Sequence, residues 1–277
     1  MEQEFERKVI EDLEKSGFNS ELRAIRTFIS SGWNCTGFAN FFDVDQETIA
    51  SIDLLAWQDK FVRQDNLRYG VQFNINAEVK KSEKPWVVFK EMSLHVNDDY
   101  INNIAYICGL TPFSLRQSMS ADSIYSKLGW RGYSIHESFQ ESDAPSDSYS
   151  AFVKVCKSAE SRLSACSAYY KELEGNLKQS NNPNPYKERV VIFVKPIVIF
   201  DGTLIAASML DTGDVSIEEI KFAPVEFYYT SKHCTKGVYL VDIVTLKSLQ
   251  GYIEISKNRQ QAIYDKVVSL SEKSTGE

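Results

Sequence analysis

Cysteine and histidine are scarce and scattered in this 277-residue sequence. The five cysteines form no Cys-x-x-Cys pair, and the three histidines lie far apart. Structural zinc sites need these ligands at short spacings, so this class of site is excluded. An odd number of scattered cysteines, without a recognisable secretory leader, leads us to expect a cytoplasmic protein with free thiols.

Long apolar runs are also lacking. The longest, VVIFVKPIVIF from Val190 to Phe200, is interrupted by Lys195 and Pro196. Eleven residues are too few to span a bilayer as a helix, so we expect no membrane association. The run instead predicts a buried pair of strands or one bent strand.

Positive charge is not in excess, because the formal net charge is -7. This balance argues against nonspecific binding of a polyanion by the whole surface. It does not exclude a local basic groove, since only the lysines and arginines along the path of the phosphates are needed.

The hydrophobic pattern predicts an α/β protein with a central mixed sheet flanked by helices. Expected helices cover residues 5–16, 20–32 (capped by Ser20), 149–179 and 246–255. Expected strands cover 33–42, 48–57, 69–81, 188–209, 217–230 and 237–244, with a hairpin turn at 43–47, and a further apolar stretch, PWVVFK, starts at Pro85. We expect a single domain, 1–277, whose core comprises about 18–90 and 149–255, and an insertion or small subdomain at about 91–148.

The segment VQFNINAEVK alternates polar and apolar residues, which is typical of a strand. Glu78 and Lys80 therefore project from one face, about 6–7 Å apart along the backbone. A carboxylate can hold a hard cation such as Mg²⁺, and a nearby lysine can orient or help deprotonate an attacking water. The alternative is a plain amphipathic strand whose polar face is solvated.

Asp53 lies in the apolar segment IASIDLLAW, which is also typical of a buried strand. An isolated buried carboxylate loses several kcal/mol of solvation, and a metal ion compensates for this loss. Two alternative roles stay open for this aspartate: it caps a turn at the strand end, or it pairs with a buried arginine.

A competing Glu-x-Lys pattern occurs at Glu219 and Lys221, with Asp201 upstream. However, Asp201-Gly202 is typical of a turn, and the strand around Glu219 lacks a clean polar face. We therefore favour the first pattern as the candidate site.

An aspartate on one strand and Glu-x-Lys on the next, after a helix carrying an acidic residue, resembles the PD-(D/E)xK superfamily, which has a restriction-endonuclease-like fold. The stretches are SIDLLAW, NAEVKKSEKPWVVF and ELRAIRTFISSGW, between Glu21 and about Phe89. A vaguer likeness covers the helix after Tyr149 and the strand that follows it. Ile52 stands where many members have proline before the aspartate.

The resemblance implies a restriction-endonuclease-like core in which Asp53 and Glu78, with the backbone carbonyl of Val79, bind Mg²⁺ or Mn²⁺. Lys80 would serve catalysis, and Glu21 would be the helical carboxylate that completes the site. Glu21 also has a simpler role open to it, because acidic residues in the first turn of a helix interact favourably with its dipole.

The function implied is hydrolysis of nucleic-acid phosphodiester bonds, with DNA favoured over RNA, in defence against foreign DNA. Lys81, Lys84 and Gln72 are candidates for substrate contact, although solvent-facing side chains are an alternative for each. A homodimer or a partner subunit could supply the remaining positive charge. The alternative function is a catalytically silent member of the same fold that acts as a nucleic-acid- or protein-binding subunit.

Overall fold

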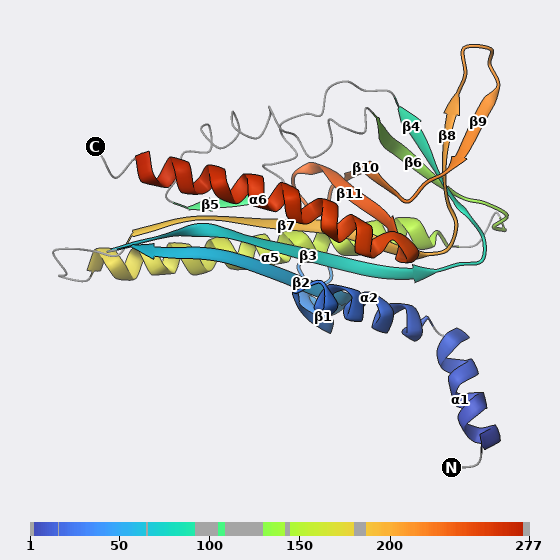
Figure 1. Ribbon diagram of the computed structural model, residues 1–277, viewed down its shortest axis with the longest axis horizontal. Coiled ribbons are helices and arrows are strands. Elements are labelled where there is room, and N and C mark those ends of the chain that lie inside the picture. The colour runs from blue at the N-terminus through green and yellow to red at the C-terminus, as the bar shows by residue number, and fades with distance from the viewer. Residues whose placement is uncertain are drawn as a thin grey trace.

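The chain folds as an α/β protein with a large mixed sheet flanked by helices (Figure 1). The computed structural model describes residues 3–15, 17–64, 66–91, 105–108, 130–141, 145–179 and 187–273. The described strands form one eleven-stranded sheet in the order β1-β2-β3-β7-β11-β10-β6-β4-β8-β9, with β5 pairing with β7. Their bounds are β1 Asn34–Asp43, β2 Thr48–Gln64, β3 Leu67–Lys81, β4 Trp86–Glu91, β5 Ala105–Cys108, β6 Arg131–Glu137, β7 Lys187–Asp201, β8 Leu204–Met209, β9 Val215–Glu219, β10 Phe222–Tyr229 and β11 Gly237–Thr245.

The centre of the sheet is the parallel pair β3–β7. The two strands are in register from Leu67 opposite Lys187 to Lys81 opposite Asp201. Thus the apolar run of β7 forms one continuous central strand rather than a pair of strands. Its interior lysine, Lys195, is accommodated by an ion pair of 2.9 Å with Asp242 of β11, because a buried charge requires a partner.

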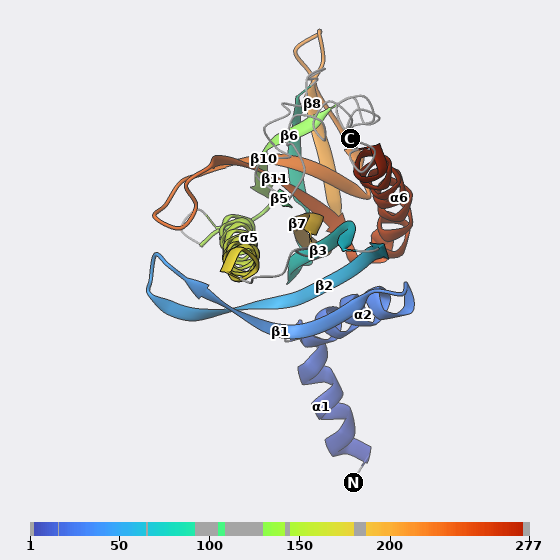
Figure 2. The same ribbon diagram turned by 90° about the vertical axis from the view of Figure 1, so that its left-hand side faces the viewer.

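Helices cover both faces of this centre. Helices α2 (Phe18–Ser30) and α6 (Leu249–Lys273) share one apolar cluster with Ile75, Ala77 and Val79 of β3. Helix α5 (Asp147–Gln179) lies on the other side of β3 and β7 from α6 (Figure 2). Helix α1 (Gln3–Lys15) projects away from the rest of the chain.

Two helix boundaries differ from the sequence-based predictions. Helix α2 begins at Phe18 after Gly17, whose φ of 83° suits glycine, so Ser20 lies inside the first turn and is not the cap. The Ser20 hydroxyl donates instead to Asp201. Helix α6 continues to Lys273 because Ile253, Ile263 and Val267 pack on the sheet, whereas the predicted helix ended at residue 255.

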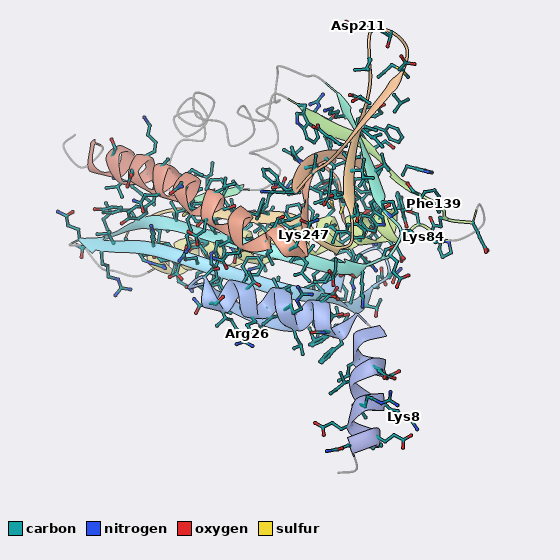
Figure 3. All side chains as sticks on the ribbon, turned by 45° about the vertical axis from the view of Figure 1, so that its right-hand side comes forward. Lys8, Arg26, Lys84, Phe139, Asp211 and Lys247 are labelled. Atoms are coloured by element: carbon teal, nitrogen blue, oxygen red, sulfur yellow. The ribbon has the colours of Figure 1, made fainter. Side chains whose placement is uncertain are left out.

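Turns divide two of the predicted C-terminal strands. The segment 188–209 forms β7 and β8, separated at the predicted Asp201-Gly202 turn, and 217–230 forms β9 and β10. Figure 3 shows Asp211 at the tip of the projecting β8–β9 hairpin. Within 91–148, the described strands β5 and β6 pair with strands of the main sheet; the rest of that segment lies largely outside the described residues.

Candidate active site

The candidate site lies where β2 separates from β3. The antiparallel ladder between them runs from Gln64 opposite Leu67 to Leu54 opposite Ala77. The next residues are Asp53 and Glu78, and Asp53 Oδ2 accepts a hydrogen bond of 2.8 Å from the Val79 N–H. The Asp53 carboxylate therefore continues the strand contact where the backbone ladder stops.

The β1–β2 hairpin is also irregular at this point. Its regular pairs are Gly37 with Leu54 and Ala39 with Ile52, so the pair at Phe38 and Asp53 is skipped. Phe38 has a φ of 54°, which is uncommon for a large side chain. The distortion coincides with the position where the Asp53 side chain turns toward β3.

Glu78 is surrounded by charged groups although only 4% of its surface is exposed. Its Oε1 lies 2.8 Å from Lys154 Nζ and 3.7 Å from Lys80 Nζ. The same Lys154 ammonium lies 3.8 Å from Asp53 Oδ1. Lys154, on α5, is a site residue that the sequence analysis missed.

Glu21 and Glu78 are influenced by the same neighbouring charges. Burial, followed by the charge of Asp53, raises the pKa of Glu78, and the contact with Lys154 and the charge of Lys80 lower it, giving a pKa of about 7. Burial and the charge of Asp53 likewise raise the pKa of Glu21. The structure thus brings together Asp53, Glu78, Lys80 and Glu21, with Lys154 between the carboxylates of β2 and β3.

Two buried oxygen atoms of this group have no hydrogen-bond partner among the residues that the structure describes. They are Oε2 of Glu78 and Oε2 of Glu21. A buried carboxylate oxygen without a partner is costly, so each unpartnered atom needs a physical cause. A cation held by Glu78 would provide one for its Oε2.

The polar face of β3 is covered by α5 and is not solvated. Ser158 accepts a hydrogen bond of 2.6 Å from Asn76, and Arg162 approaches Asn74 at 3.5 Å. With Lys154 on Glu78, these α5 residues lie four apart and form one stripe along the strand. The interpretation of a solvated outer face is therefore wrong for this strand.

The three predicted substrate contacts differ in position. Gln72 is six residues before Glu78 on β3, which corresponds to about 20 Å at the strand rise, so it lies apart from the carboxylates. Lys81 and Lys84 follow the site residues directly and are exposed. Figure 3 shows Lys84 at the surface beyond the end of β3.

The competing Glu-x-Lys pattern is not assembled around Asp201. The Asp201 side chain accepts from Ser20 and lies 3.8 Å from Arg23. Glu219 is exposed at the end of β9 and pairs with Lys247. The two carboxylates are therefore engaged by different elements.

The donor set fits a hard divalent cation, but the site is not preformed for one. Carboxylate and carbonyl oxygens are the ligands that Mg²⁺ prefers. The N–H and C=O of a strand residue point to the same neighbouring strand, so the Val79 carbonyl faces the side of Asp53. Across the described ranges, however, no three His, Cys, Asp or Glu side chains already form a metal-binding group. A cation held by Asp53 and Glu78 would need Lys154 to move.

A separate hollow lies between the β9–β10 turn and the start of α6. Its volume is about 730 Å³, and its lining includes Phe222, Tyr252, Lys221 and Lys247. None of the candidate site residues lines it.

Comparisons with protein-family models, with curated proteins and with solved structures give no match for this chain. In the part of the chain that the structure describes, no helix has the length and apolarity needed to cross a membrane.

Proposed function

We propose that this chain is a metal-dependent nuclease that hydrolyses phosphodiester bonds of nucleic acids, DNA more than RNA. The observation that carries the proposal is the convergence of Asp53, Glu78, Lys80 and Glu21 where β2 leaves β3. These are the residue types, on the same kinds of element, that the resemblance to PD-(D/E)xK nucleases implied. The proposed compartment is the cytoplasm, where the five free cysteines would stay reduced.

Each residue has a distinct proposed role. Asp53 and Glu78, with the Val79 carbonyl, would hold Mg²⁺ or Mn²⁺, and Glu21 would supply a further carboxylate. The bound cation would polarise the phosphate and make water more acidic. Lys80, whose side chain is 26% exposed, would orient the attacking water and help to remove its proton.

Lys81 and Lys84 extend positive charge from the site to the surface and would contact substrate phosphates. Contacts of this kind position the polymer without reading its sequence. A partner subunit or a second copy would add positive charge that the acidic chain lacks.

The test is cleavage of single-stranded and duplex DNA and RNA with Mg²⁺ or Mn²⁺ and with chelator. Lys80→Ala is expected to lower the rate by about 10² to 10⁴-fold, the usual contribution of a proton-transfer group. Lys60→Ala is the matched control, because Lys60 is also on the β2–β3 pair but seven residues from Asp53. Equal cleavage by the wild type and Lys80→Ala would refute the assignment.

A second candidate is favoured by one observation, the Lys154 ammonium between the two carboxylates. A chain whose ion pair is permanent would be a catalytically silent, binding subunit of the same fold. It would retard DNA in a gel-shift assay without cleaving it under any metal condition, and the nuclease proposal would then be abandoned.

A further inference from the structure

The position of Lys154 is built into the packing of α5 and is not the chance conformation of a surface lysine. Ser158 and Arg162, one and two turns further along the same stripe, contact Asn76 and Asn74 of β3. Asn76 is only 1% exposed, so its hydrogen bond fixes the helix against the strand in the interior. This register delivers the Lys154 side chain to Glu78.

Lys154 supplies the positive charge that the two poorly hydrated carboxylates require. Glu78 and Asp53 lie together in a site where the Glu78 side chain is 5% exposed and that of Asp53 is 16% exposed. Carboxylates so poorly hydrated require a counter-charge. The Lys154 ammonium, 2.8 Å from one and 3.8 Å from the other, supplies it.

We propose that Lys154 is a resident counter-ion that a divalent cation must displace, so that the Lys154-paired state and the metal-bound state exclude each other. The inference rests on the proposed function for the kind of cation, and it goes further by naming the residue that sets its affinity. Lys154 then supplies the counter-charge of the two carboxylates when no metal is bound.

Three features support exchange rather than a permanent pair. The Lys154 side chain is 31% exposed and its stem is flexible, so it has a route to solvent. Asp53 stays in place because the Val79 N–H holds it independently. The Lys154 ammonium contacts only Oε1 of Glu78, and Oε2 of the same carboxylate has no partner among the described residues, so Glu78 has unused capacity for a cation.

The test is Mn²⁺ binding to the full chain by isothermal titration calorimetry, for the wild type and Lys154→Met. Methionine has similar length but no charge, so it removes the competitor and keeps the packing. A competitor that occupies the position nine-tenths of the time weakens the apparent affinity about tenfold. Lys154→Met is therefore expected to bind Mn²⁺ at least about tenfold more tightly. Both proteins are measured at one pH above 7 with oxygen excluded, because burial and the charge of Asp53 raise the pKa of Glu78 to about 7 and Lys154, which lowers it, is absent from the variant.

Arg162→Met is the matched control. It removes a cation from the same stripe of α5, but its partner Asn74 is four residues, or about 13 Å, from Glu78 along β3. Its Mn²⁺ affinity is expected to stay within about twofold of the wild type, because a Coulomb interaction over about 13 Å is roughly a fifth of one at the 2.8 Å between Lys154 and Glu78.

Equal or weaker Mn²⁺ binding by Lys154→Met, or no binding by either protein, would overturn the inference. If circular dichroism shows that Lys154→Met is unfolded, Lys154→Gln, which retains a hydrogen-bond donor, provides the same comparison. Failure of the nuclease proposal is distinguishable: the wild type would then cleave no substrate, while a tighter Mn²⁺ affinity in the variant would still support the role of Lys154.

Discussion

Replacement of Lys157 by methionine is expected to destabilise the fold by about 3–5 kcal/mol. Lys157 is on α5, and its ammonium lies 2.9 Å from Asp43 and 2.8 Å from Asp45 of the β1–β2 turn. The side chains of Lys157 and Asp43 are only 9% and 7% exposed. Methionine retains the apolar stem but leaves two carboxylates without their counter-charge, and breaking a buried pair from one side has this cost.

The loss of stability caused by Lys157→Met should depend on pH. Burial raises the pKa of Asp45, but hydrogen bonds from Lys157 and Ser231 outweigh it and lower the pKa to about 2. Burial also raises the pKa of Asp43, but hydrogen bonds, first that from Lys157, outweigh it, so this pKa is lowered as well. A carboxylate whose folded pKa is below its unfolded value, about 4, stabilises the fold above that value. This stabilisation is lost as pH falls toward 2. The gap between wild type and Lys157→Met should therefore be full at pH 7 and shrink below about pH 4.

The assay is urea unfolding followed by circular dichroism at pH 7 and at about pH 3. Lys232→Met is the control, since Lys232 pairs with Glu47 of the same turn at 3.2 Å but both side chains are exposed, at 66% and 75%. Lys232→Met should lower the free energy of unfolding by less than about 1 kcal/mol. A Lys157→Met variant as stable as the control, or a gap unchanged at low pH, would refute the reasoning.

Three further substitutions probe the framework of the site, each by urea unfolding or thermal melting. Trp86→Ala should cost about 3–5 kcal/mol, because the indole is 1% exposed and stacks on Phe200 at 4.2 Å between ring centroids; a loss below about 1 kcal/mol would contradict the packing. Ser158→Ala should cost about 1–3 kcal/mol by leaving the Asn76 amide unpartnered, and no loss would argue against the α5–β3 stripe. Gly70→Ala should prevent folding, because its Cβ would lie 2.1 Å from a backbone carbonyl of β2; a folded, stable variant would exclude the β2–β3 register.

The strands that carry the site could be predicted from the sequence because their signal is local. Regular alternation around Glu78 predicted β3, and the apolar neighbours of Asp53 predicted β2. The solvent exposure of each strand face was not predictable, since it depends on what covers the face. Asn74 and Asn76 resemble solvated residues in sequence, but α5 buries them.

Lys154 could not be assigned from its local sequence for the same reason. It lies in α5 among apolar residues, where a lysine ordinarily faces solvent. The one local signal was the polar stripe at Lys154, Ser158 and Arg162, whose members are spaced four apart on the helix. The stripe predicts a polar partner for the helix but does not identify which strand provides it, because the segments are more than seventy residues apart in the chain.

The charge balance of the site gives a further reason to expect that a divalent cation replaces the Lys154 ammonium. Three carboxylates, Asp53, Glu78 and Glu21, stand against two ammonium groups, Lys80 and Lys154, so the ionised site carries one excess negative charge. Burial first, and the charge of Asp53 second, raise the pKa values of both Glu78 and Glu21. Exchange of Lys154 for a divalent cation would neutralise the group and give Oε2 of Glu78 a partner. A monovalent cation in the same place would leave the excess unchanged, so selective tightening of divalent binding in Lys154→Met is the result that this charge balance requires.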